Sequence, residues 1–136
     1  MNNEKTCYYA FPGFADICHV MYRNQERFGF PAFLILCTLD GYKQKTAENF
    51  RMLYDDSQMT ETVICEHLTK GDVFTRYSDT QYLILKMGAE AECEHLCQTL
   101  QCDLQKSTAN QIHVNFSCSP LGQLKPSQER RQAVYI

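Results

Sequence analysis

The chain has 136 residues, which suits one compact domain with a single core and is too short for two. Its net charge of -3 leaves no basic footprint for nucleic acid. The longest strongly apolar run, residues 32–37, is far shorter than the roughly 20 residues that a membrane helix needs. The start, "MNNEKTCYYAF", lacks the basic and apolar segments of a signal peptide. We therefore expect a cytoplasmic domain without direct nucleic acid or membrane contact.

A first helix is predicted over residues 14–28, where apolar residues recur at helical spacing until Gly29 and Pro31 end it. The run "AFLILCTL" (32–39) follows. Its continuous apolar character predicts a central strand that is covered on both faces. Asp40 and Gly41 then turn the chain.

Helical spacing returns from residue 46 to residue 68, ending at Gly71. The predicted apolar stripe consists of Ala47, Phe50, Leu53, Ser57, Ile64 and Leu68. The sequence Asp55-Asp56-Ser57 could divide this region into two helices. Neighbouring positions on a helix do not face one another, so Asp55 and Asp56 are interpreted as a solvated acidic face rather than a catalytic pair.

Residues 73–77 and 81–86 predict two strands joined too closely for anything but an antiparallel hairpin. A helix over 90–104 and an alternating strand over 112–119, which Pro120 interrupts, complete the pattern. This order predicts an α+β fold, with helices packed on a mixed sheet around a central antiparallel hairpin. We assign residues 1–121 to the domain and 122–136 to an extension or tail.

Eight cysteines raise the question of disulfides or a metal. Six of them lie within apolar patterns and are predicted to be reduced, buried thiols: Cys18, Cys37, Cys65, Cys93, Cys97 and Cys118. On a helix, Cys93 and Cys97 share a face while His95 points away, and no paired CxxC completes four ligands. Zinc remains an alternative here, but we expect no metal and no cofactor. Cys65 and His67 diverge on a helix in the same way, so they predict no nucleophile and base pair.

The segment from Lys70 to Tyr77, together with Tyr82 and the apolar residues 83–85, resembles the hairpin of GGDEF domains. These are diguanylate cyclases of the nucleotidyl-cyclase fold, whose hairpin reads approximately R-Y-G-G-D-E-F. The run "TLDGYK" (38–43) is similar to the family's D-I-D-x-F-K. The chain also resembles the GGDEF-like domain at the C-terminus of some bacterial transcriptional activators of the BTAD or SARP type. In those the turn reads RYS-x-x-Q-[FY], and helix-turn-helix and activator domains lie upstream.

The positions at which this chain departs from the GGDEF pattern bear directly on its function. The degenerate signature turn comprises Arg76, Tyr77, Ser78, Asp79, Thr80, Gln81 and Tyr82. The acidic metal ligands of the family fall on Thr38 and Gln81, which carry no charge for Mg²⁺. Ser78 and Asp79 replace the glycines that admit the nucleotide. The inhibitory motif R-x-x-D keeps Asp72 but has Thr69 in place of its arginine, so a bidentate phosphate partner is lost.

The resemblance therefore implies a non-catalytic signalling or protein-interaction domain of a bacterial transcription regulator. Its expected partners are the upstream DNA-binding and activator domains of the same regulator, a second copy of itself, or both. The alternative is a receptor for a nucleotide or cyclic dinucleotide, or a divergent diguanylate cyclase. Asp40 and Asp79 are the carboxylates that a rearranged metal site could use.

Overall fold

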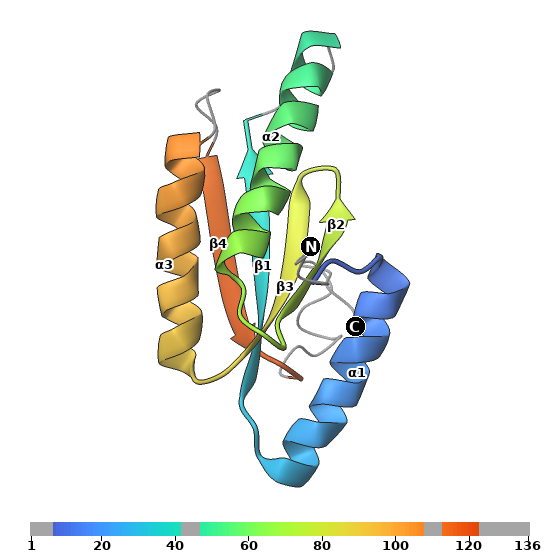
Figure 1. Cartoon of the computed structure of the whole chain (residues 1–136). Helices are drawn as coiled ribbons and strands as arrows, with labels where there is room; N and C mark the ends of the chain where they lie inside the picture. Colours follow the sequence, from blue (N-terminus) through green and yellow to red (C-terminus); the bar gives the residue numbers. More distant parts are fainter. Residues whose placement is uncertain (1–6, 42–46, 108–112, 123–136) are drawn as a thin grey trace, which may run out of the picture.

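A computed structural model describes residues 7–41, 47–107 and 113–122 of the chain (Figure 1). The helices and strands follow one another in the order predicted. They are α1 (Phe11–Phe28), β1 (Ala32–Asp40), α2 (Ala47–His67), β2 (Val73–Ser78), β3 (Gln81–Met87), α3 (Glu90–Ser107) and β4 (His113–Pro120). The predicted tail lies outside the described residues from 123 onwards. The fold class is α+β, as expected.

The four strands form one sheet in the order β2-β3-β1-β4. All three pairings between these strands are antiparallel, so the sheet is not mixed as predicted, and the hairpin lies at one side of it rather than at its centre. The β-α-β-β-α-β sequence with this strand order is the split βαβ arrangement. The hairpin of β2 and β3 forms one side of the sheet, and β2 is its outer strand. The only parallel pairing among the described residues is an isolated bridge between Tyr8 and Phe74.

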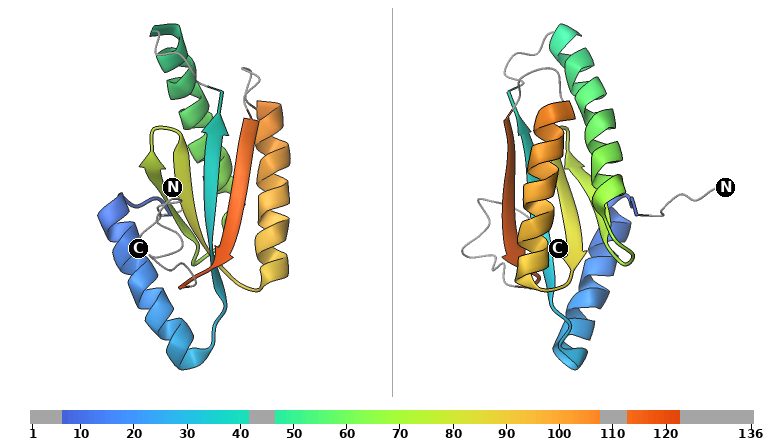
Figure 2. Two further views of the ribbon diagram at one scale, coloured as in Figure 1. Left: turned by 180° about the vertical axis from the view of Figure 1, so that it is seen from behind. Right: turned by 60° about the vertical axis from the view of Figure 1, so that its left-hand side comes forward.

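Strand β1 is apolar without interruption from Ala32 to Cys37 because it faces a core on each side. Ile35, Cys37 and Leu39 point into the core under α2 and α3. Ala32 and Leu34 point into a second core under α1. Side chains of a strand alternate between faces, so a run covered on both faces needs apolar residues at every position. The view from behind shows the sheet in front of α2 and α3 (Figure 2). The prediction of a central, doubly covered strand is confirmed.

Helix α2 differs from the prediction in two respects. It is continuous over 21 residues, so Asp55-Asp56-Ser57 does not break it. Its first turns project beyond the end of the sheet (Figure 1), which leaves Phe50 57% exposed although the predicted stripe included it. The stripe is buried only where the sheet lies beneath it, from Ser57 onwards through Ile64 to Leu68. The expected acidic face is right for Asp55, which is exposed, and wrong for Asp56, which is 4% exposed.

All eight cysteines are free thiols, including the six for which this was predicted. Cys18, Cys37 and Cys93 are buried, whereas Cys65 and Cys97 are half-buried. Cys118 is exposed because β4 is the outer strand on its side of the sheet, so the prediction of its burial was wrong. Cys7 is buried although no periodic pattern contains it. No helix in the described part of the chain is long and apolar enough to cross a membrane.

Candidate functional site

The two positions at which the resemblance places metal ligands lie opposite each other in the sheet. Thr38 of β1 pairs in register with Gln81 of β3. The Gln81 side-chain amide donates a hydrogen bond of 3.4 Å to the Thr38 hydroxyl. The side-chain oxygen Oε1 of Gln81 accepts a hydrogen bond of 3.0 Å from the Ser78 hydroxyl. The polar atoms at these positions therefore bond to one another.

The turn itself is a two-residue connection through Asp79 and Thr80. The Thr80 amide donates to the Ser78 hydroxyl over 3.3 Å. The Thr80 carbonyl accepts from the backbone amide of Leu39 over 2.8 Å. These contacts attach the turn to the neighbouring strand β1. The predicted tight hairpin is confirmed, with a register irregularity between Arg76 and Ser78.

Arg76 holds the turn from the side of β2. Its guanidinium donates to the carbonyl oxygens of Asp79, at 2.7 Å, and Ser78, at 3.2 Å. It also donates to the Ser57 hydroxyl of α2 over 3.0 Å and lies 5.7 Å from the centroid of the Tyr82 ring. A planar guanidinium presents several donors in one fork, which suits it to bind carbonyls on both sides of a turn. Arg76 therefore acts as a structural clamp between the turn and α2.

Tyr82 and Tyr77 are anchored on opposite sides of the hairpin. The Tyr82 hydroxyl donates to Glu61 of α2 over 2.9 Å, and burial raises the pKa of this phenol above its usual range. The Tyr77 ring packs against Phe11 of α1, with ring centroids 5.5 Å apart. Ser57 and Glu61, which tie α2 to the hairpin, were not predicted as site residues. Their spacing of four on a helix face was the available signal.

Carboxylates do not converge on this turn in the way that a divalent cation requires. Asp40 and Asp79 are both exposed, at the end of β1 and in the turn. Within the described residues, no three His, Cys, Asp or Glu side chains lie where they could share a metal ion. Glu61 already accepts from Tyr82 and lies 4.0 Å from Arg76. The residues present thus fit a closed hydrogen-bonded turn better than a site for Mg²⁺, which takes carboxylate and phosphate oxygens.

Asp72, the retained residue of the inhibitory motif, is buried and saturated with donors. It accepts hydrogen bonds from the amide and the hydroxyl of Thr69, at 3.0 and 2.8 Å. Lys86 lies 3.0 Å away as its ion-pair partner, and the Met87 amide donates over 2.9 Å. The carboxylate thereby joins the loop after α2 to β3. It is occupied by the fold and is not displayed towards solvent.

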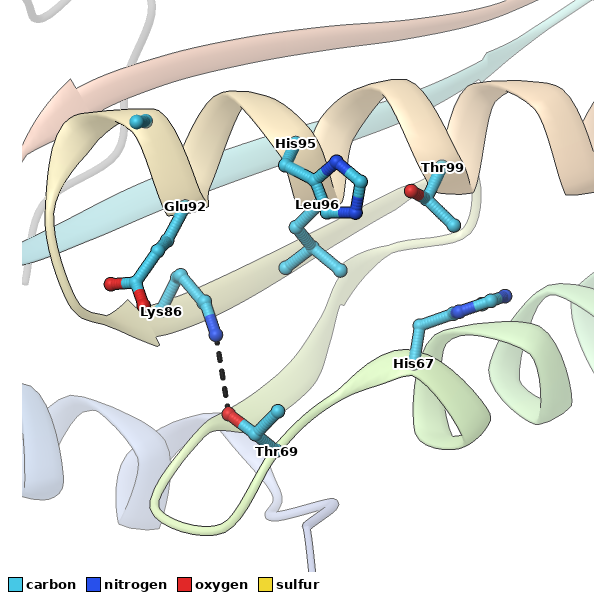
Figure 3. A pocket seen from close by; sticks show the side chains of 8 residues that line it. His67, Thr69, Lys86, Glu92, His95, Leu96 and Thr99 are labelled. Atoms are coloured by element: carbon cyan, nitrogen blue, oxygen red, sulfur yellow. Dashed lines mark hydrogen bonds between the residues drawn. The ribbon is translucent and has the colours of Figure 1, made fainter.

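A cavity of about 400 Å³ opens beside this ion pair (Figure 3). Helix α3 supplies Glu92, His95, Leu96 and Thr99, and Ala91 completes its wall, while His67, Thr69 and Lys86 come from the other side. The Lys86 ammonium is held by Asp72 and also donates to Thr69. His67 lies 2.5 Å from Asp103. Lys86 and His67 on that wall therefore each already have a carboxylate partner.

The cysteines that raised the zinc alternative gather at the seam between α3 and β4. Cys93 and Cys97 of α3 interact with Cys118 of β4. The spacing of the cysteines in the sequence did not predict that Cys118 lies near the other two. Burial raises the pKa of Cys97 to about 11. Among the described residues, these thiols do not form part of any set of three side chains placed to share a metal ion. His95 is exposed and points away from these thiols, as predicted.

Comparisons with known proteins identify structures of the same fold but no close relative in sequence. No family model matches the chain, and no curated protein does. Among solved structures, a DGC protein from Thermotoga maritima superposes with a TM-score of 0.68 at 14% identity, covering 87% of this chain and 85% of that one. The GGDEF domain of DgcB from Caulobacter crescentus, in complex with c-di-GMP, gives 0.65 at 11% identity, with 94% and 82% covered.

A third structure is the diguanylate cyclase SiaD in complex with its activator SiaC, from Pseudomonas aeruginosa. It superposes with a TM-score of 0.64 at 15% identity over 87% of this chain, which spans only 49% of that protein. The fold of this chain is thus that of the GGDEF domains of diguanylate cyclases. At these identities the likeness establishes the fold alone, so activity must be argued from the residues of the turn.

Proposed function

We propose that this chain is a non-catalytic GGDEF-like signalling or protein-interaction domain. The observation that carries the proposal is the hydrogen bond between Gln81 and Thr38 at the two metal-ligand positions. Two cations that activate a triphosphate need anionic ligands to hold them against each other and against the phosphates. An amide and a hydroxyl provide no charge, and here they are already bonded to each other. Ser78 and Asp79 add side chains where the family has glycines.

We further propose that the domain belongs to a bacterial transcription regulator. In that arrangement the partners are the upstream DNA-binding and activator domains, with a second copy of the chain as a further candidate. The complex of SiaD with its activator SiaC supports an interaction role, because it is a protein of this fold bound to a partner protein. The net charge of -3 favours leaving DNA contact to another domain.

The second candidate is a receptor for a cyclic dinucleotide, which the cavity beside Thr69 favours. The charges of its wall count against it. Lys86 is neutralised by Asp72, and Glu92 adds a negative charge that repels a phosphate. A dianionic ligand needs donors such as a free guanidinium, and the arginine of the motif is Thr69 here. Interaction without a nucleotide is therefore the better account.

Calorimetric titration of the chain with GTP and Mg²⁺, and separately with cyclic di-GMP, tests this proposal. We expect no saturable heat at millimolar ligand in either titration and no cyclic di-GMP product. The variant Thr69→Arg, which returns a guanidinium to the motif, serves as the matched control for the cyclic dinucleotide. Binding of cyclic di-GMP by the unmodified chain would establish the receptor function instead. Turnover of GTP would establish a cyclase.

A further inference from the structure

The segment before α1 covers the outer edge of the hairpin. Residues Cys7 to Tyr9 run alongside β2, where Tyr8 and Phe74 form a parallel bridge. The Phe74 amide donates to the Cys7 carbonyl over 2.8 Å, and the Tyr9 amide donates to the Phe74 carbonyl over 3.0 Å. The Tyr8 and Phe74 rings meet edge to face, 5.2 Å apart. A strand edge that would otherwise be exposed is thereby covered by this short segment.

Cys7 also reaches across to α2. Its sulfur lies 2.8 Å from the sulfur of Cys65, which is 58 residues away in the sequence. Non-bonded carbon atoms are about 3.5–4.0 Å apart at their optimum, and sulfur is larger, so this contact is unusually close. A covalent sulfur–sulfur bond is about 2.05 Å long, so less than about 1 Å of movement separates the two arrangements. The two sulfur atoms are thus close enough to bond after a small movement.

We propose that Cys7 and Cys65 form a reversible disulfide that fastens the N-terminal segment to α2 when the domain meets a peroxide. In the first step the Cys65 thiol takes one oxygen atom from hydrogen peroxide, giving a sulfenic acid and one water. In the second, the Cys7 sulfur displaces the hydroxyl of that acid, forming the S–S bond and releasing a second water. The two thiols together lose two electrons and two protons, and the peroxide is reduced. A dithiol reductant reverses the bond by exchange.

The accessibility of the two cysteines fits these roles. Cys65 is half-buried and can meet a small oxidant, whereas Cys7 is 4% exposed and lies where it can resolve the sulfenic acid. The other close thiols are less suited, because burial raises the pKa of Cys97 to about 11 and that of Cys37 to about 12. The thiolate is the nucleophile, so these thiols react slowly at neutral pH. In intracellular proteins disulfides are typically of this transient, redox-sensing kind.

The bond would change how firmly the edge of the hairpin is covered. Without it, the two backbone hydrogen bonds and the ring contact with Phe74 attach the segment to β2. With it, α2, the segment and β2 are tied together. A disulfide across a long loop also restricts the unfolded chain, which stabilises the folded state. Oxidation therefore holds the segment more firmly against β2.

The test is to treat the whole chain with hydrogen peroxide, digest it without reduction and identify linked peptides by mass spectrometry. We expect Cys7 joined to Cys65, release of the link by dithiothreitol, and a melting temperature raised by roughly 5–10 °C on oxidation. Amide exchange at Tyr9 should slow by at least about tenfold. The variant Cys65→Ala should show none of these changes. Cys102→Ser, which alters an exposed cysteine of α3, should show all of them.

Two results would overturn the proposal. One is full alkylation of Cys7 and Cys65 after peroxide treatment, which would show that no bond forms between them. The other is a link from Cys65 to a different cysteine, or a rise in melting temperature that Cys65→Ala retains. The linked-peptide measurement needs only the wild-type chain, so it decides the matter even if a variant folds poorly. Its outcome is independent of nucleotide binding at the turn.

Discussion

Asp72 is the residue whose replacement we expect to be most costly. Its side chain is fully buried beside Lys86, whose side chain is 9% exposed. In Asp72→Asn the ammonium is left buried beside a neutral amide, which removes its ion-pair partner. Breaking one side of a buried ion pair costs about 3–5 kcal/mol. Urea denaturation of the variant should show a loss of this size in the free energy of unfolding.

The matched control is Asp79→Asn, which changes an exposed carboxylate in the turn. We expect a change within about 0.5 kcal/mol, because the backbone carbonyl of Asp79, and not its carboxylate, binds Arg76. A loss below about 1 kcal/mol for Asp72→Asn would mean that the acid is not the structural residue described here.

Arg76 is the second residue whose role is open to direct measurement. Arg76→Lys keeps the charge but removes the fork that reaches Ser78, Asp79 and Ser57 together. We expect a loss of about 1–2 kcal/mol in chemical denaturation, since the group is a third exposed and part of its gain is screened. The same exchange at Arg51, which is exposed on α2, should leave the free energy of unfolding unchanged. If Arg76→Lys and Arg51→Lys were equally stable, Arg76 would not be a structural clamp.

Helix α2 was the element that sequence periodicity described least well. Periodicity reports which side of a helix is apolar, not where the sheet beneath it ends. Phe50 has the spacing of the apolar stripe, but it lies on the projecting turns and is exposed. Asp56 is buried, although aspartate is usually found on the surface. Ser57 and Glu61 contact the hairpin because α2 packs on the sheet. The local sequence pattern does not predict this packing.

A pair of variants on α2 measures where its buried face begins. Ile64 is fully buried, so Ile64→Ala should cost about 2–4 kcal/mol through lost contacts and the cavity left behind. Phe50 is 57% exposed, so Phe50→Ala should change the free energy of unfolding by about 0.5 kcal/mol or less. Thermal or urea unfolding of both variants gives the comparison. A large loss at Phe50 would place the projecting turns in an interface, such as one between two copies of the chain.

For the whole molecule, the sequence predicted the order of helices and strands and the α+β fold, because each element has its own period and a glycine marks four of the boundaries, at Gly29, Gly41, Gly71 and Gly88. Strand β1 could be predicted as doubly covered from its unbroken apolar run. Contacts between distant segments were beyond reach. The bond between Thr38 and Gln81, the donors around Asp72 and the approach of Cys7 to Cys65 all depend on how strands register and helices pack. Only the resemblance indicated that Thr38 and Gln81 are neighbours in function.

Whether the domain is closed to catalysis depends on the absence of charge at those two neighbouring positions. Calorimetric titration with Mg²⁺ of the wild-type chain and of the double variant Thr38→Asp with Gln81→Glu tests this directly. The single variant Thr38→Asn serves as an uncharged control. We predict no saturable heat from the wild type or from the control at millimolar cation, and measurable binding by the double variant, whose two carboxylates face each other in register. Binding by the wild type as strong as that of the double variant would contradict the account.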